Sequence, residues 1–177
     1  MKKIILAVTL VFCGSQFTNF VPELSIDASA KAYEMKTSFA KDLKAGTMPY
    51  AKGFVGMTYK KLKTKAKIQK IDSYNGQIYY SHERAKDDWD NYIFKKSNFS
   101  SNSKIISIER SYDYIISQKS VEKYFGKPYK KQDFGGGFIR AMYKNGKYYI
   151  IVAPYSEDGI TATYVTIGTK KAVLKRW

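Results

Sequence analysis

Residues 59–71 read Tyr-Lys-Lys-Leu-Lys-Thr-Lys-Ala-Lys-Ile-Gln-Lys-Ile, and the expected fold depends on them more than on any other stretch. From residue 61 to residue 68, lysine alternates strictly with small or apolar residues. Because successive side chains of a β-strand point to opposite faces of a sheet, this period of two predicts a half-buried strand. At a rise of roughly 3.3 Å per residue, its exposed face would carry ammonium groups about 6.6 Å apart. The row consists of Lys61, Lys63, Lys65 and Lys67.

This lysine row has two interpretations. Lysines on an edge strand prevent sheets from pairing with one another, so the row can serve as protection against aggregation. Like charges in line also repel one another, and counter-ions or a bound polyanion would relieve that repulsion. The row alone does not decide between an edge device and a binding surface.

The net charge favours the second interpretation. The chain has 31 Lys and Arg residues against 15 Asp and Glu residues, which gives a formal net charge of +16. An excess of this size attracts polyanions such as nucleic acid, anionic cell-wall polymers, membrane surfaces and sulfated glycans. The hydrophobic content of 44% is that of a globular protein, and it excludes a disordered polycation.

The N-terminal residues have the pattern of an export signal. A positively charged start is followed by an apolar run over residues 4–12 and by the small-residue pattern Ala28-Ser29-Ala30. We therefore expect a signal peptide over residues 1–30, with cleavage after Ala32 as the alternative. The only cysteine, Cys13, lies in this segment, so the exported chain would have no disulfide. No segment reaches the roughly 20 apolar residues of a transmembrane helix.

The first half of the remaining chain predicts one helix and several strands. Residues 31–48 form either a frayed arm or a short helix around residues 37–45, which Gly46 would end. After the lysine strand, Asn75-Gly76 is the signal of a tight hairpin. Further strands are expected over residues 77–82, 91–95 and 104–110.

The second half predicts a helix followed by three strands. Residues 117–125 form the helix, which Ser117 or Ser120 would cap and Gly126 would end. A second Asn-Gly turn, Asn145-Gly146, separates the first two strands. The strands are expected over residues 138–143, 148–153 and 160–168, and a basic tail follows over residues 170–177.

These elements predict an α+β protein with one or more small antiparallel sheets and one or two short helices. The two halves have helix-end and turn residues in a similar order, which is consistent with two degenerate helix-plus-meander units. The expected boundaries are a signal peptide at 1–30, an N-terminal arm or short helix at 31–48, a first β-rich unit at 49–113, and a helix plus three-strand meander at 114–177.

No pattern predicts an enzyme, a cofactor or a metal site. His82 is the only histidine, and no Gly-x-Ser-x-Gly nucleophile motif occurs. Asp87, Asp88 and Asp90 lack the spacing of a calcium loop and are interpreted as a solvated turn. Residues 135–137 are three glycines without the Gly-Lys-Ser/Thr ending of a phosphate loop. Binding, rather than catalysis, is therefore the expected activity.

Tyrosines are interleaved with the basic residues along the chain. Single-stranded nucleic-acid binders combine a basic groove with aromatic faces on which bases stack, whereas duplex binding would use lysines alone. The alternative is that these tyrosines are ordinary half-buried sheet residues. Besides the lysine row, the predicted nucleic-acid-binding residues are Lys60, Lys70, Lys130, Lys131, Arg140, Lys144 and Lys147, with Tyr59, Tyr80 and Tyr129 as stacking platforms.

Residues 117–131, Ser-Gln-Lys-Ser-Val-Glu-Lys-Tyr-Phe-Gly-Lys-Pro-Tyr-Lys-Lys, resemble the immunodominant staphylococcal antigen B family. The likeness extends to Pro49-Tyr50, Gly53-Phe54-Val55-Gly56, Asn75-Gly76 and Val165-Thr166-Ile167-Gly168. These are small, basic, secreted or surface-associated proteins whose reported activity is sequence-independent binding of extracellular nucleic acid. The resemblance implies the same activity here but assigns no binding residue. The helix-then-meander order also resembles β-lactamase-inhibitor-like folds, although their disulfides are missing.

The expected function is thus sequence-independent binding of nucleic acid or another polyanion by a secreted or cell-surface-associated, non-enzymatic protein. Two alternatives remain open. One is a secreted interaction or inhibitor module that acts on a host or bacterial protein. The other is a surface antigen retained on anionic cell-wall polymer, for which the charge is only an anchor.

Overall fold

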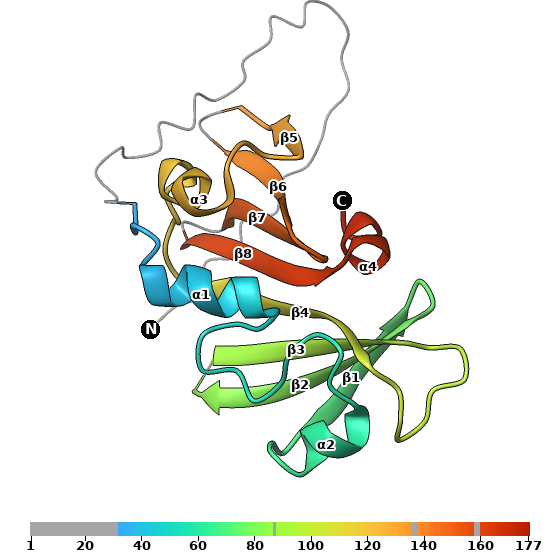
Figure 1. Cartoon of the computed structure of the whole chain (residues 1–177). Coiled ribbons are helices and arrows are strands. Elements are labelled where there is room, and N and C mark those ends of the chain that lie inside the picture. The colour runs from blue at the N-terminus through green and yellow to red at the C-terminus, as the bar shows by residue number, and fades with distance from the viewer. Residues whose placement is uncertain (1–31, 87, 136–137, 158–159) are drawn as a thin grey trace, which may run out of the picture.

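One antiparallel sheet of eight strands organises the computed structural model (Figure 1). The structure describes residues 32–86, 88–135, 138–157 and 160–177, so the predicted signal peptide lies outside it. The strands, in the sheet order β1-β2-β3-β4-β8-β7-β6-β5, are β1 (Gln69–Tyr74), β2 (Gln77–Ala85), β3 (Asp88–Lys95), β4 (Ile105–Tyr112), β8 (Ile160–Thr169), β7 (Tyr148–Glu157), β6 (Ile139–Asn145) and β5 (Lys130–Asp133). The helices are α1 (Thr37–Ala45), α2 (Tyr59–Lys63), α3 (Gln118–Phe125) and α4 (Lys170–Leu174).

The predicted α+β class is wrong, because the fold is mainly β. Eight strands form one sheet, and the four helices of the described residues have only 9, 5, 8 and 5 residues. Strands β1 to β4 and β5 to β8 each form an antiparallel meander, and the pairing of β4 with β8 joins the two. That pairing brings Ser107 opposite Gly168. The two residues are far apart in the chain, so no local sequence pattern predicts that they pair.

The predicted lysine strand is also wrong. The segment forms α2 and a following turn, and the Thr58 side chain caps the helix by accepting a hydrogen bond from the Lys61 backbone N–H. Leu62 and Ala66 are both buried. They lie four residues apart, so the apolar residues of the alternating pattern satisfy a helical turn as well as a strand. Alternate residues of a helix point about 200° apart, so the lysines form no single row.

Other local predictions are confirmed. The helix expected around residues 37–45 is α1, and Gly46 ends it in the left-handed conformation at φ 83°. The helix expected at 117–125 is α3, and the Ser117 hydroxyl accepts a hydrogen bond from the Ser120 backbone N–H at its start. Asn75 and Gly76 have φ values of 50° and 70°, as a tight hairpin between β1 and β2 requires.

The helices cover the two faces of the sheet unequally. Residues Tyr143, Ile150 and Val152 face a large core that includes side chains from α1, α2 and α3. Their neighbours Met142 and Ile151 face the other side and pack with Val173 of α4. The alternation of side chains along β6 and β7 therefore separates a thick core from a small one.

A buried ion pair links the segment around Pro49 to the sheet. Arg110, with 1% of its surface exposed, donates from Nε (2.7 Å) and Nη2 (2.5 Å) to Asp90 Oδ1. Its Nη1 donates to the Pro49 carbonyl oxygen at 2.8 Å. The interpretation of Asp90 as part of a solvated turn is therefore wrong, because β3 carries this carboxylate into the interior, where Arg110 compensates its charge.

Candidate functional site

One end of the sheet collects lysines from separate parts of the chain. The β3–β4 connection, the β6–β7 turn and the start of α4 lie at this end, as the pairs Gln77–Lys95, Ser107–Gly168 and Tyr148–Thr169 require. Figure 1 shows the β1–β2 turn, the β3–β4 connection and α4 on the same side of the molecule. We call this surface the lysine end. It comprises Lys95, Lys96, Lys104, Lys144, Lys147, Lys170, Lys171 and Lys175, all of them exposed.

The charges of the lysine end have no acidic partners within the described part of the chain. Every ion pair there uses an arginine; these pairs are Arg84–Asp88, Arg84–Asp90, Arg110–Asp90 and Arg176–Glu109. Among the described residues, Lys175 is the one lysine of this surface whose side chain hydrogen-bonds protein: its Nζ donates to the Asn75 carbonyl oxygen at 2.9 Å. The surface therefore presents uncompensated positive charge to solvent.

The lysine end is wide enough for an extended polymer. Neighbouring strands lie about 4.8 Å apart, so the five strands whose ends carry these lysines, from β3 to β6 in the sheet order, span about 19 Å. Twist between successive strands, about 20–25° each, rotates the lysines progressively along that width. Duplex DNA carries one phosphate per roughly 1.7 Å of axis, so about six base pairs match the span.

The lysines predicted from residues 60–70 flank this surface. The Lys60 backbone N–H donates to the Ser101 carbonyl oxygen, which places α2 against the β3–β4 connection. Lys60, Lys61 and Lys63 lie on α2, whereas Lys65 and Lys67 follow it and Lys70 lies on the edge strand β1. All of them are exposed. The structure brings the α2 lysines close to the lysine end and leaves the later ones along one edge of the sheet.

The basic residues predicted in the second half separate into three groups. Lys144 and Lys147 flank the β6–β7 turn and belong to the lysine end. Lys130 and Lys131 lie on β5, the edge strand opposite β1, with side chains on different faces. Arg140 is engaged within the protein: it donates to the carbonyl oxygens of Arg176 and Trp177, and burial together with nearby Arg176 lowers its pKa.

Two of the three predicted stacking platforms are half-buried and pack against other aromatic rings. Tyr59 and Tyr80 lie 4.9 Å apart, ring centroid to centroid, in a cluster with Phe94 and Phe99. Burial, followed by the hydrogen bond with Tyr59, raises the pKa of Tyr80 to about 12. Tyr129 differs, because 48% of its surface is exposed. Its ring contacts the Tyr149 ring edge-on, and Lys170 Nζ lies 5.8 Å from its centroid.

Sequence reasoning missed most of the lysine end. It did not single out Lys95, Lys96, Lys104, Lys170, Lys171 or Lys175. A usable signal was present, because Lys95-Lys96 and Lys170-Lys171 lie at or just after the ends of the strands predicted over residues 91–95 and 160–168. Lysine pairs at strand ends gather in space only when the strand order brings those ends together.

The described residues offer no other obvious chemical centre. They contain no group of three or more His, Cys, Asp and Glu side chains placed to hold a metal ion. Their helices include none long and apolar enough to cross a membrane. His82 Nδ1 lies 2.9 Å from the Lys67 carbonyl oxygen. Among the described residues, His82 has no hydrogen bond to a nucleophilic side chain.

Comparisons with known proteins add one distant structural similarity. No protein-family model and no curated protein matches the sequence. Among solved structures, the chain is similar to a DUF4309 family protein, YjgB, from Bacillus subtilis, with a TM-score of 0.49 and 11% identity. The alignment covers 75% of this chain and 93% of that chain.

Proposed function

We propose that this protein binds nucleic acid without sequence preference, through the lysine end, and has no enzymatic activity. The observation that carries the proposal is the gathering, at one end of the sheet, of exposed lysines from the β3–β4 connection, the β6–β7 turn and the α4 region, without ion-pair partners among the described residues. Lysines placed in this way neutralise phosphates and release counter-ions, which supplies affinity but reads no bases. The resemblance to the staphylococcal antigen B family, noted above, points to the same activity and to an exported protein.

The packing of the tyrosines favours duplex over single-stranded nucleic acid. Stacking on single strands needs aromatic faces that are free in the unbound protein. Tyr59 and Tyr80 are packed against Phe94 and Phe99, and only Tyr129 among the three predicted platforms is largely exposed. Contacts to phosphates alone leave no reason for a preference for single strands. We therefore expect duplex affinity at least equal to single-strand affinity.

The test compares two variants with equal charge. The first changes Lys95, Lys104, Lys144, Lys147 and Lys170 of the lysine end to Gln. The matched control changes five other exposed lysines to Gln: Lys41 on α1, Lys52 between α1 and α2, and Lys119, Lys123 and Lys127 on or just after α3. Both lose the same net charge, so any difference between them reports the position of the charge.

Binding is measured by fluorescence anisotropy with duplexes of unrelated sequence over a series of salt concentrations. At roughly 0.9 per contact, the lysine-end variant should lower the slope of log K against log salt by about four units. The control variant should lower it by about one unit or less. Equal slopes for the two variants would show that the charge acts without a localised surface, and would reject the proposed site.

Competition distinguishes nucleic acid from anionic wall polymer. Purified teichoic acid, added to the preformed complex at matched phosphate concentration, should displace a duplex only weakly if the lysine end fits the regular spacing of duplex phosphates. Displacement at lower teichoic acid concentration than duplex competitor would assign the wall polymer as the preferred partner.

A further inference from the structure

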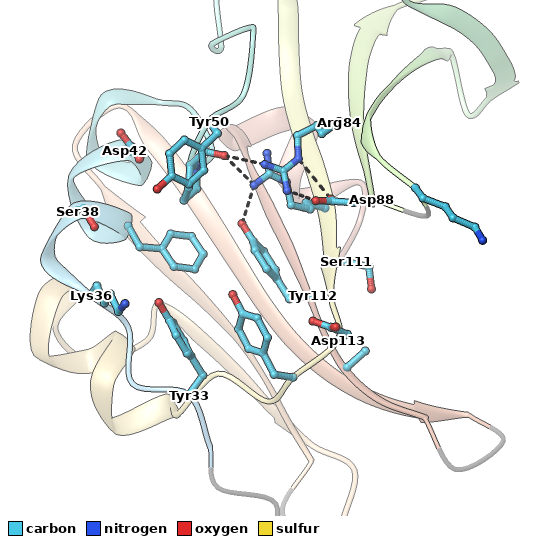
Figure 2. Close-up of a pocket in the computed structure, with 16 residues that line it drawn as sticks. Tyr33, Lys36, Ser38, Asp42, Tyr50, Arg84, Asp88, Ser111, Tyr112 and Asp113 are labelled. Carbon is cyan, nitrogen blue, oxygen red and sulfur yellow. Dashed lines mark hydrogen bonds and ion pairs between the residues drawn. The ribbon is translucent and has the colours of Figure 1, made fainter.

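A second candidate site lies at the opposite end of the sheet. Here a pocket of about 720 Å³ opens between α1, the β2–β3 turn and the end of β4 (Figure 2). A volume of this size suits a ligand of a few rings. Its wall includes side chains from five parts of the chain, so only the folded protein assembles it.

Four aromatic rings form a continuous row along the pocket. Tyr33 and Tyr114 lie 4.6 Å apart between ring centroids, Tyr114 and Tyr112 lie 5.4 Å apart, and Tyr112 and Phe39 lie 5.4 Å apart. Figure 2 shows the Tyr33 and Tyr112 rings along the same wall. Phe39 is buried, so the accessible part of the row comes from the three half-buried tyrosines, which offer ring edges and faces together with phenol hydroxyl groups.

The strongest charges at the pocket are already compensated. Arg110 is paired with buried Asp90, and Arg84 is paired with Asp88. Arg84 and Arg110 also donate to the Pro49 carbonyl oxygen. Both guanidinium groups are therefore occupied by protein partners and offer an anionic ligand little. The remaining ionic groups, Lys36, Lys86, Asp42 and Asp113, balance in sign.

Several polar groups of the pocket still have hydrogen-bonding capacity. Within the described residues, no protein group hydrogen-bonds the hydroxyls of Tyr33 and Tyr114 or the carboxylates of Asp42 and Asp113. The Tyr112 hydroxyl accepts from Arg110 Nη1 at 3.3 Å and keeps its own proton for donation. Burial raises the pKa of Tyr112 and brings the pKa of Tyr114 to about 12, so both phenols are neutral donors at physiological pH.

Tyr50 adds a strained, exposed aromatic ring at the pocket. Its φ is 60°, which is unfavourable for a residue with a side chain, and 88% of its surface is exposed. Neighbouring backbone is fixed on both sides: Pro49 by the two arginines, and residues 52 and 53 by N–H donation to the Tyr92 hydroxyl at 3.1 and 3.3 Å. Tyr50 thus combines an exposed aromatic ring with an unfavourable backbone conformation, and this combination is typical of residues that contact ligands.

From these features we propose that the pocket binds a neutral oligosaccharide. The apolar C–H faces of sugar rings fit the aromatic row and Tyr50. Sugar hydroxyls donate to the carboxylates of Asp42 and Asp113 and accept from the neutral phenols. A polyanion is disfavoured, because the arginines are occupied and two carboxylates are free. This site is independent of the nucleic-acid function proposed for the lysine end.

The test uses cellotriose, maltotriose and N,N′,N″-triacetylchitotriose, three neutral trisaccharides that differ in linkage and substitution. Saturation-transfer NMR and calorimetry on the purified protein should detect binding of at least one, with a dissociation constant of about 1 mM or lower. Tyr50→Gly should weaken that binding at least tenfold. Its folding should be unaffected or improved, because glycine adopts the positive φ of this position without strain.

Two further variants complete the test of saccharide binding. Asp113→Asn should weaken binding by about threefold to tenfold, because an amide replaces one carboxylate acceptor. Tyr129→Ala removes a tyrosine at a distance from the pocket and should leave saccharide affinity unchanged. The proposal is overturned if none of the three sugars binds at up to about 10 mM, tenfold above the expected limit, or if Tyr50→Gly binds as well as the unaltered protein.

Discussion

The two ends of the sheet treat charge in opposite ways. At the lysine end, exposed lysines have no acidic partner within the described residues. At the pocket end, arginines are paired: Arg110 with Asp90, and Arg84 with Asp88. Removing an unpaired surface charge changes binding but little else, whereas removing one partner of a buried pair leaves an uncompensated charge in the interior.

The difference shows how the protein can separate stability from binding. Buried charge must be paired and hydrogen-bonded, so the pocket end couples the ion pairs to the fold of residues 47–53. Charge that stays in water needs no partner, so lysines can accumulate at the other end at small cost. The following experiments test this division, in order of decreasing expected effect.

The buried pair should dominate stability. Asp90→Ala leaves Arg110 without a charge partner in the interior, and should lower the free energy of unfolding by about 3–5 kcal/mol. Urea unfolding measures the change. Lys95→Ala, the control at the lysine end, should stay within about 0.5 kcal/mol of the unaltered protein. A loss below about 1 kcal/mol for Asp90→Ala would mean that the pair is not the anchor of the pocket end.

Alkaline pH should destabilise the protein through its buried tyrosines. Burial raises the pKa of Tyr92, Tyr112 and Tyr164 above the ordinary value of 10.0. Below pH 10 both states are protonated and the stability is fully present. As pH rises further, the unfolded chain releases protons that the folded protein retains, so stability falls. Each retained proton costs about 1.4 kcal/mol per pH unit.

Stability measured by urea unfolding between pH 9 and about pH 12, around the tyrosine pKa, should show this decline. Tyr112→Phe removes one titrating group and should make the decline shallower. At pH 7 Tyr112 is protonated in both the folded and the unfolded state, so its titration does not affect stability there. A stability that is constant across this range, or that rises, would contradict the burial of these phenols.

The α2 segment should contribute modestly to polyanion binding. A continuous row of four lysines on a strand would reduce the salt slope by three to four units on conversion to Gln, at roughly 0.9 per contact. Of these four lysines, only Lys61 and Lys63 lie on α2, beside the β3–β4 connection. Converting Lys61, Lys63, Lys65 and Lys67 to Gln should therefore lower the slope by about two units or less, measured by anisotropy. A change near four would restore these residues as the main site.

The smallest effect is expected for Tyr129. The edge of Tyr149 and the ammonium of Lys170 already occupy its surroundings, so the ring offers little face to a base. Tyr129→Leu should reduce single-strand affinity by less than about threefold, well short of the 1–3 kcal/mol of a stacked base. A tenfold loss for single strands, with duplex affinity unchanged, would identify Tyr129 as a stacking platform and reverse the expected preference.

Local signals in the sequence were sufficient for turns and helix ends. Asn75-Gly76 and Asn145-Gly146 mark hairpins because few other residues tolerate the positive φ that tight turns need. Gly46 and Ser117 mark the ends of α1 and α3 for equally local reasons. The alternating lysine segment misled because Leu62 and Ala66 suit a helical turn as well as a strand, and a segment this short contains too few residues to decide.

The sequence by itself therefore determined the net charge, the absence of catalytic motifs and most of the local elements. Only the tertiary structure decided that β4 pairs with β8, that Lys95, Lys144 and Lys170 meet at one end, and that Asp90 is buried against Arg110. The physical reason is the distance along the chain over which each kind of interaction acts. Caps, turns and periodicity act over a few residues, whereas strand order and buried ion pairs depend on packing between side chains that are distant in the chain.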